Sequence, residues 1–336
     1  MKAVVLTKHG KGLDVLKIQE VDKPSISSGE VLIEVEGFGL NFADVMARNN
    51  LYKAAPPIPS VLGYEVVGNV VKGEPDLIGK RVLAFTRFGG YAQYAKADVR
   101  ALVELSNDTP LGDALALGTQ GATAWFAAFY NIKINKGDNV LVHSGAGGVG
   151  SILIQMIKNL DVNIYSTAGS SKKCEFIKSQ GADFVYDYNN PNYWEQIKRD
   201  TKGRGLDVIF DAVGGETYKN GFKSLSAGGK MVTYGAAYRT KSSSSFFTKV
   251  KMLFQFGFTN PLFFMLNSRT VCGVNMLKVG DDRPDILNVC LKEVMRMYSE
   301  GKIKPIVHDV YEVEKIGQAH DDLENRKTIG KVGVKW

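Results

Sequence analysis

The sequence has only three cysteines and four histidines, and neither residue type forms a cluster. Because Cys174, Cys272 and Cys290 are odd in number and far apart, we expect reduced thiols, as in a cytoplasmic protein, and no disulfide framework. No cysteine precedes Cys174 and the histidines are scattered, so their spacing matches neither a structural nor a catalytic zinc site. We therefore expect no bound metal.

Long hydrophobic runs are also absent. No stretch of about 18 apolar residues is present, so we expect no transmembrane helix. Residues 1–6 enter a predicted strand without the apolar core and cleavage site of a secretion signal. The net charge is +7, but we interpret the lysines as spread along the chain and not interleaved with aromatic residues, which disfavours nucleic acid as a partner.

A glycine-rich segment, residues 144–150, follows an apolar run at 139–143 and precedes a predicted helix at 151–159. Its glycines have the G-x-G-x-x-G spacing, which allows a tight turn, a close approach of backbone to pyrophosphate and close packing of helix on strand. The amino end of the helix would face the phosphates, where the helix dipole favours anions. We expect a dinucleotide to contact Gly145, Gly147, Gly148 and Val149.

The residues after the second predicted strand, 162–167, indicate which dinucleotide binds. An NAD site has an acidic residue about 20 residues beyond the glycines, where it binds the ribose 2′-hydroxyl. This chain instead has Ser170, Lys172 and Lys173 in that region, and a lysine would attract the 2′-phosphate of NADPH. The alternative is that the two lysines form only a solvated helix start, although cations are unfavourable at that end of a helix.

The pattern of apolar, glycine and proline residues changes along the chain. Short β-branched runs separated by glycine and proline indicate a β-rich domain over 1–120, and strands then alternate with helices over 121–277, which predicts a parallel sheet. The chain returns to the first domain over 278–336. The predicted strands of the second segment are 140–143, 163–167, 184–186, 208–211 and 230–234, and the third segment has a predicted helix at 284–301 and short strands over 306–336.

Further segments carry spaced motifs. Residues 39–48 with Tyr52 read G-x-N-x-x-D…R…Y, residues 59–68 read P-x-x-x-G-x-E-x-x-G, and Gly330-Lys331-Val332 lies near the end. Together they resemble the medium-chain dehydrogenase/reductase superfamily, and within it the zinc-free, zeta-crystallin-like quinone oxidoreductases. Residues 246–277 differ, and resemble the branch related to the vesicle amine transport protein. The resemblance implies an α/β fold, with a doubly wound Rossmann domain and a β-rich GroES-like catalytic domain.

The resemblance implies that Asn41 and Tyr64 stand where zinc-dependent members have cysteine and histidine ligands. Without a metal to polarise a substrate oxygen, NADPH-dependent reduction of a quinone or an α,β-unsaturated carbonyl is favoured, because conjugation delocalises the added charge. We expect Asn41 to donate a hydrogen bond near the nicotinamide ribose and the substrate. Tyr52 and Tyr64 either donate to the developing enolate oxygen or only pack, with solvated hydroxyls.

The resemblance also implies cofactor contacts outside the glycine motif. Lys173 would bind the 2′-phosphate and Tyr188 would close over it. Further candidates are Thr123, Ser170, Lys331 and, at the ends of later strands, Val213, Gly235 and Ala236. Two polar residues are expected to be structural: Asp44 would pair with Arg48 one helical turn away, and His143 would cap a strand end.

A second hypothesis is an NADPH-binding regulatory or interaction protein with little turnover, peripheral to a membrane. The aromatic residues of 253–266 favour it, because they could serve a partner or a membrane surface. We expect the insert 246–266, with its seven phenylalanines, to form either an apolar wall over the cleft for a bulky substrate or a buried plug. We also expect a homodimer through the strand-prone segment 270–276, since pairing would cover an exposed sheet edge.

Overall fold

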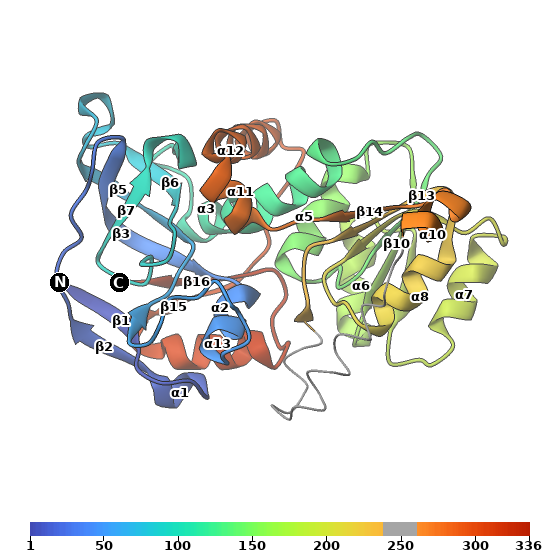
Figure 1. Cartoon of the computed structure of the whole chain (residues 1–336), viewed down its shortest axis with the longest axis horizontal. Coiled ribbons are helices and arrows are strands. Elements are labelled where there is room, and N and C mark those ends of the chain that lie inside the picture. Colours follow the sequence, from blue (N-terminus) through green and yellow to red (C-terminus); the bar gives the residue numbers. More distant parts are fainter. Residues whose placement is uncertain (238–260) are drawn as a thin grey trace. The chain divides into compact units, whose positions relative to one another are not determined.

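The protein is described by a computed structural model over residues 1–237 and 261–336. The chain divides into two compact units (Figure 1). Unit 1 comprises Met1–Ala122 with Met276–Trp336, and unit 2 comprises Thr123–Asn275.

Unit 2 contains a parallel sheet whose strands are β9 (Asn139–Val142), β10 (Asn163–Ala168), β11 (Phe184–Asp187), β12 (Leu206–Asp211), β13 (Leu225–Thr233) and β14 (Thr270–Gly273). They lie in the order β11-β10-β9-β12-β13-β14, so the chain enters at the centre and builds outward on both sides. Every residue of β9 is buried, as is typical of a parallel strand covered on both faces. The doubly wound α/β fold expected for this part is confirmed.

The helices of unit 2 are α5 (Gly148–Ile157), α6 (Ser171–Gln180), α7 (Tyr193–Asp200), α8 (Glu216–Ser224) and α10 (Pro261–Asn267), with α4 (Ala122–Trp125) and η4 (Phe126–Tyr130) at its start. Helix α5 begins three residues before the predicted position, directly on the glycine motif. Of the insert 246–266, residues 246–260 lie outside the described residues, and the remainder belongs to α10.

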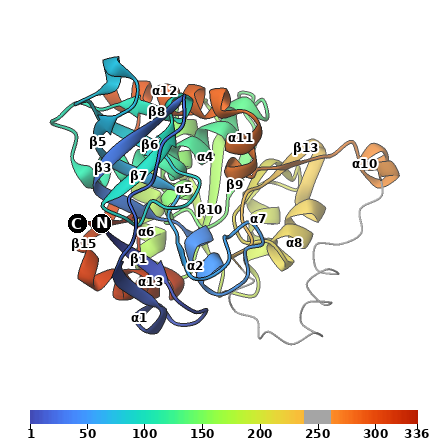
Figure 2. The same cartoon turned by 60° about the vertical axis from the view of Figure 1, so that its left-hand side comes forward.

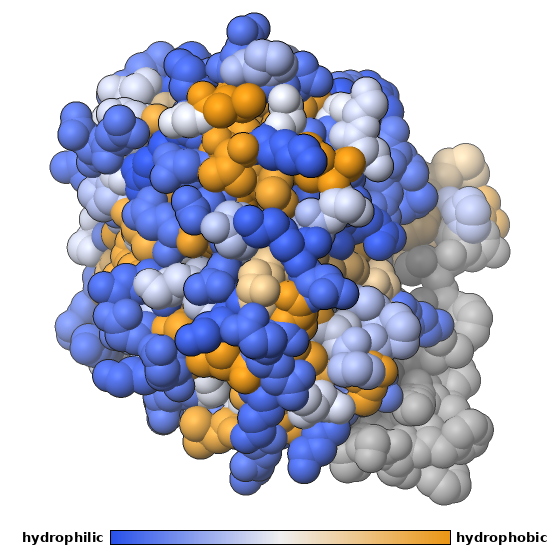
Figure 3. Space-filling view, turned by 90° about the vertical axis from the view of Figure 1, so that its left-hand side faces the viewer, coloured by the Kyte–Doolittle hydropathy of each residue, from blue (hydrophilic) through white to orange (hydrophobic). Residues whose placement is uncertain are grey.

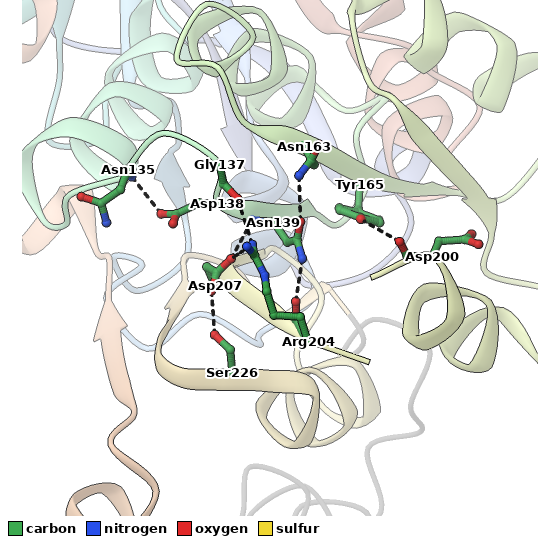
Figure 4. Close-up of polar contacts among 11 residues, drawn as sticks. Asn135, Gly137, Asp138, Asn139, Asn163, Tyr165, Asp200, Arg204, Asp207 and Ser226 are labelled. Atoms are coloured by element: carbon green, nitrogen blue, oxygen red, sulfur yellow. Dashed lines mark hydrogen bonds and ion pairs between the residues drawn. The ribbon is translucent and has the colours of Figure 1, made fainter. Parts of the chain in front are cut away.

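A polar network closes the amino-terminal end of this sheet (Figure 4). The side chain of Asn139 donates to Gly205 O at 2.9 Å and accepts from Asn163 Nδ2 at 3.0 Å. Asp207 accepts from Asn139 N at 2.8 Å and from Ser226 Oγ at 2.7 Å, and it pairs with Arg204. Because these groups satisfy one another, this end of the sheet offers few unpaired polar atoms to a ligand.

Strand β14 is the last strand of the sheet order and pairs with β13. It ends at Gly273, so the predicted strand over 270–276 was too long at its carboxyl end. Just before it, Arg269 donates to Phe222 O at 2.7 Å and to Leu225 O, at the carboxyl end of α8. The guanidinium therefore joins α10 and β14 to the body of unit 2 at a helix end where a cation is favourable.

Unit 1 is β-rich. Its larger sheet has the order β15-β16-β3-β5-β6-β8, with β7 paired to β3, and a smaller sheet has the order β2-β1-β4. The strands are β1 (Lys2–Leu6), β2 (Leu16–Glu20), β3 (Glu30–Leu40), β4 (Ser60–Val61), β5 (Glu65–Lys72), β6 (Arg81–Phe85), β7 (Tyr94–Asp98), β8 (Leu102–Glu104), β15 (Val307–Glu312) and β16 (Lys331–Lys335). Apolar side chains of these strands form the core, in which Phe38 stacks on Tyr91 at 4.5 Å.

The helical elements of unit 1 are α1 (Gly12–Val15), α2 (Phe42–Arg48), η1 (Pro75–Leu77), η2 (Val99–Ala101), α3 (Leu111–Ala116), η3 (Leu117–Gly121), α11 (Met276–Asp282), α12 (Pro284–Ser299), η6 (Val313–Lys315) and α13 (Ile316–Glu324). Helix α12 lies where it was predicted. Helix α13 was missed, since residues 306–336 were interpreted as short strands only.

No helix among residues 1–237 and 261–336 is long and apolar enough to cross a membrane. The face of the molecule in Figure 3 is largely hydrophilic, and its hydrophobic side chains lie in small groups separated by hydrophilic ones. Cys174, Cys272 and Cys290 are all free thiols, as expected.

Candidate functional site

Most of the predicted cofactor residues lie at one end of the unit 2 sheet. Gly145, Gly147, Gly148 and Val149 follow β9, Ser170 and Lys173 follow β10, Tyr188 follows β11, Val213 follows β12, and Gly235 and Ala236 follow β13. In parallel strands these are all carboxyl ends, and the glycine motif lies at the central strand, where the strand order reverses. Ligands of open parallel sheets bind at that position. Thr123 is separate from these loops, in α4.

The three glycines of the motif have different surroundings. A Cβ on Gly150 would lie 2.5 Å from Ser144 O, and one on Gly145 would lie 3.0 Å from Ile154 Cδ1. Packing of the turn therefore requires both residues to be glycine. A Cβ on Gly147 would meet only Ser144 O, at 3.2 Å, so packing alone requires this glycine far less. Gly147 is also the N-cap of α5, and no side chain caps the helix, which fits a turn whose backbone faces a phosphate.

The segment after β10 has two features that suit an anion. Ser170 is the N-cap of α6 and accepts from Lys173 N at 3.4 Å, which puts Lys172 and Lys173 in the first helical turn. Tyr188 N donates to Ala168 O at 2.9 Å, and its ring lies so close to Gly169 that a Cβ there would be 2.9 Å from Tyr188 Cε2. The tyrosine and the lysine-bearing turn are thus adjacent, and the two cations lie where a helix dipole alone would disfavour them.

Asp211, the last residue of β12, organises the next loop and was not singled out from the sequence. Its fully buried carboxylate accepts from Val213 N at 2.8 Å, Gly214 N at 3.0 Å and Thr217 Oγ1 at 3.1 Å. The backbone also joins this loop to the loop after β13, since Ala237 N donates to Ala212 O at 3.3 Å. An aspartate that ends a buried strand just before Val-Gly-Gly was the available sequence signal.

Among the residues that the structure describes, several buried polar atoms at this same end have no hydrogen-bond partner. They are His143 Nε2, Thr233 Oγ1 and Tyr234 Oη. His143 Nδ1 lies 3.0 Å from Thr167 Oγ1, and burial lowers the pKa of His143, so its ring is neutral. This agrees with a structural residue and not a charged base. Unpaired buried groups are costly, and a polar ligand at this edge would satisfy them. The residues present therefore fit a bound dinucleotide.

In unit 1, Asn41 lies in a buried polar cluster with two residues of neighbouring strands. Asn41 Nδ2 donates to Glu65 Oε1 at 3.0 Å, and Lys331 Nζ donates to Asn41 Oδ1 at 3.1 Å. Glu65 and Lys331 form an ion pair and are both 0% exposed, and Glu65 Oε2 accepts from Thr119 N. Glu65 was missed as a site residue, although it is the glutamate of the P-x-x-x-G-x-E-x-x-G motif at residues 59–68.

Among the described residues no cation pairs with Asp44, and its predicted pairing with Arg48 was wrong. The Asp44 carboxyl is fully buried; Oδ2 accepts from Asn41 N at 2.9 Å, and Oδ1 has no partner. Burial is the largest influence and raises the pKa of Asp44 to about 7, while the Asn41 amide and Lys331 oppose the rise and Glu65 adds to it. Asp44 is therefore a carboxyl group that holds its proton close to neutral pH.

Arg48 instead joins α2 to α13. Its fully buried guanidinium donates to Asp321 Oδ1 at 3.2 Å and to Glu324 Oε2. In the same region His320 Nε2 lies 3.3 Å from the Tyr91 hydroxyl, and burial together with the Arg48 charge lowers the pKa of His320 to about 3. Arg48 pairs with acidic residues of α13 and not with Asp44, because α13, which was not predicted from the sequence, brings two carboxylates to the guanidinium.

The two predicted tyrosines are in contact. The rings of Tyr52 and Tyr64 are 6.3 Å apart in an edge-on arrangement, and among the described residues the buried hydroxyl of Tyr64 has no hydrogen-bond partner. Phe88 packs on the other side of Tyr64, with ring centroids 5.0 Å apart. Burial raises the pKa of both phenols, so both are protonated hydroxyls that can donate a hydrogen bond. Within the described ranges, no group of three or more histidine, cysteine or acidic side chains could hold a metal ion.

Comparisons with known proteins agree with both units. A family model described as alcohol dehydrogenase GroES-like domain matches residues 27–107, and one described as zinc-binding dehydrogenase matches residues 180–334. The synaptic vesicle membrane protein VAT-1 homolog of Danio rerio is 31% identical over 338 residues, which cover 98% of this chain and 69% of that protein. The quinone oxidoreductase of Rattus norvegicus is 28% identical over 340 residues, 99% of this chain and 96% of that protein.

Solved structures give the same picture. The quinone oxidoreductase of Escherichia coli complexed with NADPH has a TM-score of 0.86 at 25% identity, with 100% of each chain covered. The human synaptic vesicle membrane protein VAT-1 homolog-like protein has a TM-score of 0.83 at 26% identity, covering 100% of this chain and 98% of that one.

The Asp44→Asn variant tests the protonation of Asp44. The folded state keeps a proton that the unfolded carboxyl releases above its ordinary pKa of 3.8, so this stabilisation is complete below about pH 4 and is lost as the pH rises through about 7. Asparagine stays neutral. We expect the free energy of unfolding of the variant, relative to the wild type, to rise by roughly 1–3 kcal/mol between about pH 4.5 and pH 8.

Urea unfolding at both pH values measures this difference. Asp108→Asn, at an exposed carboxyl of unit 1, is the control. A difference between Asp44→Asn and the wild type that does not change with pH would contradict the assignment.

Proposed function

This chain belongs to the quinone oxidoreductase group of the medium-chain dehydrogenase/reductase superfamily, and from that premise we propose that it is a zinc-independent, NADPH-dependent reductase of quinones or α,β-unsaturated carbonyls. The observation that carries the proposal is the glycine turn at the carboxyl end of the central strand β9, beside buried polar atoms that lack partners. The E. coli relative with NADPH in its structure supports the choice of cofactor.

Under this proposal unit 2 binds the cofactor. The backbone of Gly145, Gly147, Gly148 and Val149 faces the pyrophosphate, Ser170 and Lys173 bind the 2′-phosphate, Tyr188 covers it, and Thr123, Val213, Gly235 and Ala236 complete the contacts. When bound, NADPH supplies a hydride from its nicotinamide ring. The loops of unit 2 hold and orient it, and Asp211 keeps the Val213 loop in shape by binding its amides.

Unit 1 supplies polar groups to the substrate. Asn41 donates a hydrogen bond, and the protonated hydroxyls of Tyr52 and Tyr64 donate to the oxygen on which negative charge develops. The prediction that Lys331 contacts the cofactor remains a prediction; its ammonium bonds to Asn41 and Glu65. We further propose that the enzyme is cytoplasmic and a homodimer, with β14 as the paired edge strand.

The activity is tested with NADPH and a panel of quinones and enones. We expect Asn41→Ala and Tyr52→Phe each to lower kcat about tenfold or more, because each removes a donor to the developing charge, and to leave the Kd for NADPH within about threefold. The matched controls in unit 1 are Asn107→Ala, at an exposed position, and Tyr94→Phe, at a half-buried position where the hydroxyl donates to Glu34. Full activity of both site variants on every accepted substrate would place the chemistry elsewhere.

Cofactor preference is tested by fluorescence titration. We expect NADPH to bind at least about tenfold tighter than NADH, a difference of about 1.4 kcal/mol. Lys173→Glu should remove most of that preference, because a carboxylate repels the 2′-phosphate. Lys178→Glu, later on the same helix, is the control. Equal affinities of the wild type for the two cofactors would refute the proposal.

A second candidate function, an NADPH-binding protein at a membrane surface, is favoured by one feature of unit 2. Over residues 217–275 the sequence has eight lysines and arginines, close to the density of the whole chain, and no acidic residue, so this stretch is basic because acidic residues are missing from it. Within it, α10 exposes four apolar side chains: Leu262, Phe263, Met265 and Leu266. It lies at the periphery of unit 2 in Figure 2. Basic and exposed apolar residues together suit an anionic lipid surface.

Flotation with lipid vesicles tests this candidate. We expect binding to vesicles that contain phosphatidylserine and weak binding to neutral vesicles, with a loss of at least about tenfold for the double variant Met265→Ser, Leu266→Ser, which removes apolar area. Ile78→Ser, a similarly exposed apolar position in unit 1, is the control. No binding to either vesicle would remove this candidate and leave the reductase proposal unaffected.

A further inference from the structure

Glu65 and Lys331 form their ion pair across strand β3, which lies between the strands that carry them. Strand β3 lies between β5, which begins at Glu65, and β16, which begins at Lys331. Gly39, on β3, leaves the room for this contact: a Cβ there would lie 2.6 Å from Lys331 Nζ. A Cβ on Gly118 would lie 3.1 Å from Glu65 Cδ. Two glycines therefore leave space for the buried charges, and larger residues would force them apart.

The pair acts on both ends of one amide. Asn41 Nδ2 faces the carboxylate of Glu65, and Asn41 Oδ1 faces the ammonium of Lys331. A flip of the amide would put its oxygen against the carboxylate and its NH2 group against the ammonium, and both contacts would be repulsive. Only one orientation is compatible with the two charges. In that orientation one of the two N–H groups of Asn41 Nδ2 donates to Glu65, and its second N–H group can donate to a further acceptor.

Stability alone is a weak reason for this arrangement. Glu65 and Lys331 are both 0% exposed, and an ion pair so deeply buried loses as much in desolvation as it gains in attraction. Apolar residues of similar volume often stabilise a core equally well. Apolar residues do not distinguish the oxygen of a carboxamide from its nitrogen. A carboxylate on one side and an ammonium on the other do distinguish them, because each charge binds only one of the two groups.

We propose that Glu65 and Lys331 are positioning residues that lock the Asn41 carboxamide in one orientation, with an N–H directed to the reacting groups. The locking stands on the contacts alone, and its value for the reaction rests on the proposed function. Lys331 therefore acts through Asn41 and not by direct contact with the cofactor. A catalytic hydrogen bond loses much of its effect on the rate when its direction is slightly wrong. Fixing the direction of the Asn41 N–H is therefore the role proposed for Glu65 and Lys331.

The first test is independent of activity. The full-length protein with 15N-labelled asparagine is studied by NMR, with the Asn41 side-chain amide assigned from the Asn41→Ala spectrum. We expect two separate, slowly exchanging Nδ2 protons in the wild type. The double variant Glu65→Gln, Lys331→Met removes both charges together, which avoids an unpaired buried ion. In it, exchange of these protons with water should be at least about tenfold faster, since the charge-assisted bonds are gone.

The second test separates positioning from folding. The double variant should lower kcat roughly tenfold and keep the Kd for NADPH within about threefold. In an Asn41→Ala background, the same two substitutions should change kcat by less than about twofold, because the group they orient is absent. Glu324→Gln, which removes one of the two carboxylates paired with the buried Arg48, is the control: it should lower the Tm without faster Asn41 exchange and without coupling to Asn41→Ala.

Three results would overturn the proposal. One is Asn41 exchange that is as slow in the double variant as in the wild type. Another is a loss of kcat that is equally large with and without Asn41, which would indicate a general effect on the fold. The third is direct cofactor contact by Lys331, seen as a loss of NADPH affinity with unchanged kcat. A wild type without turnover would remove the proposed function, and the amide exchange would still decide the locking.

Discussion

The pairing of Glu65 with Lys331 decides the state of the other polar groups buried around it. Unit 1 encloses two carboxyls, one ammonium and one amide in a small volume, and the ammonium is bound by Glu65 and Asn41. The guanidinium of Arg48 is likewise bound by the acidic residues of α13. Asp44 is thus left without a cation, and burial raises its pKa to about 7. The orientation of the Asn41 amide follows from this ion pair, and the protonation of Asp44 follows mainly from its burial.

In unit 2 the two ends of the parallel sheet differ in how many of their buried polar groups have hydrogen-bond partners. At the amino-terminal end, Asn139, Asp207 and their neighbours satisfy one another (Figure 4). At the carboxyl end, atoms of His143, Thr233 and Tyr234 have no partner among the described residues. At the amino-terminal end Arg269 Nε, just before β14, is likewise buried without one. Since an unsatisfied buried group costs free energy, the cluster at the carboxyl end favours a polar ligand there, beside the glycine turn.

Predictions from local sequence succeeded where the cause was local. The strands of unit 2 and the glycine turn follow from apolar runs and from a spacing that serves one turn and one helix. The pairing of Asp44 with Arg48 failed although its spacing along α2 was suitable, because Arg48 binds Asp321 and Glu324 of α13 while Asp44 is buried against the Asn41 amide. Asp211 was missed because an acidic residue at a strand end does not reveal whether it is buried, and Glu65 was missed because its motif does not reveal which distant residue it meets.

Composition, periodicity and short spacings are properties of neighbouring residues, and from the sequence they predicted the parallel sheet of unit 2 and the position of the glycine turn. Which polar residues meet depends on the tertiary structure. Asn41, Glu65 and Lys331 are far apart along the chain and become neighbours through the register of β16, β3 and β5. That register depends on how side chains on both faces pack, and no single segment contains this information.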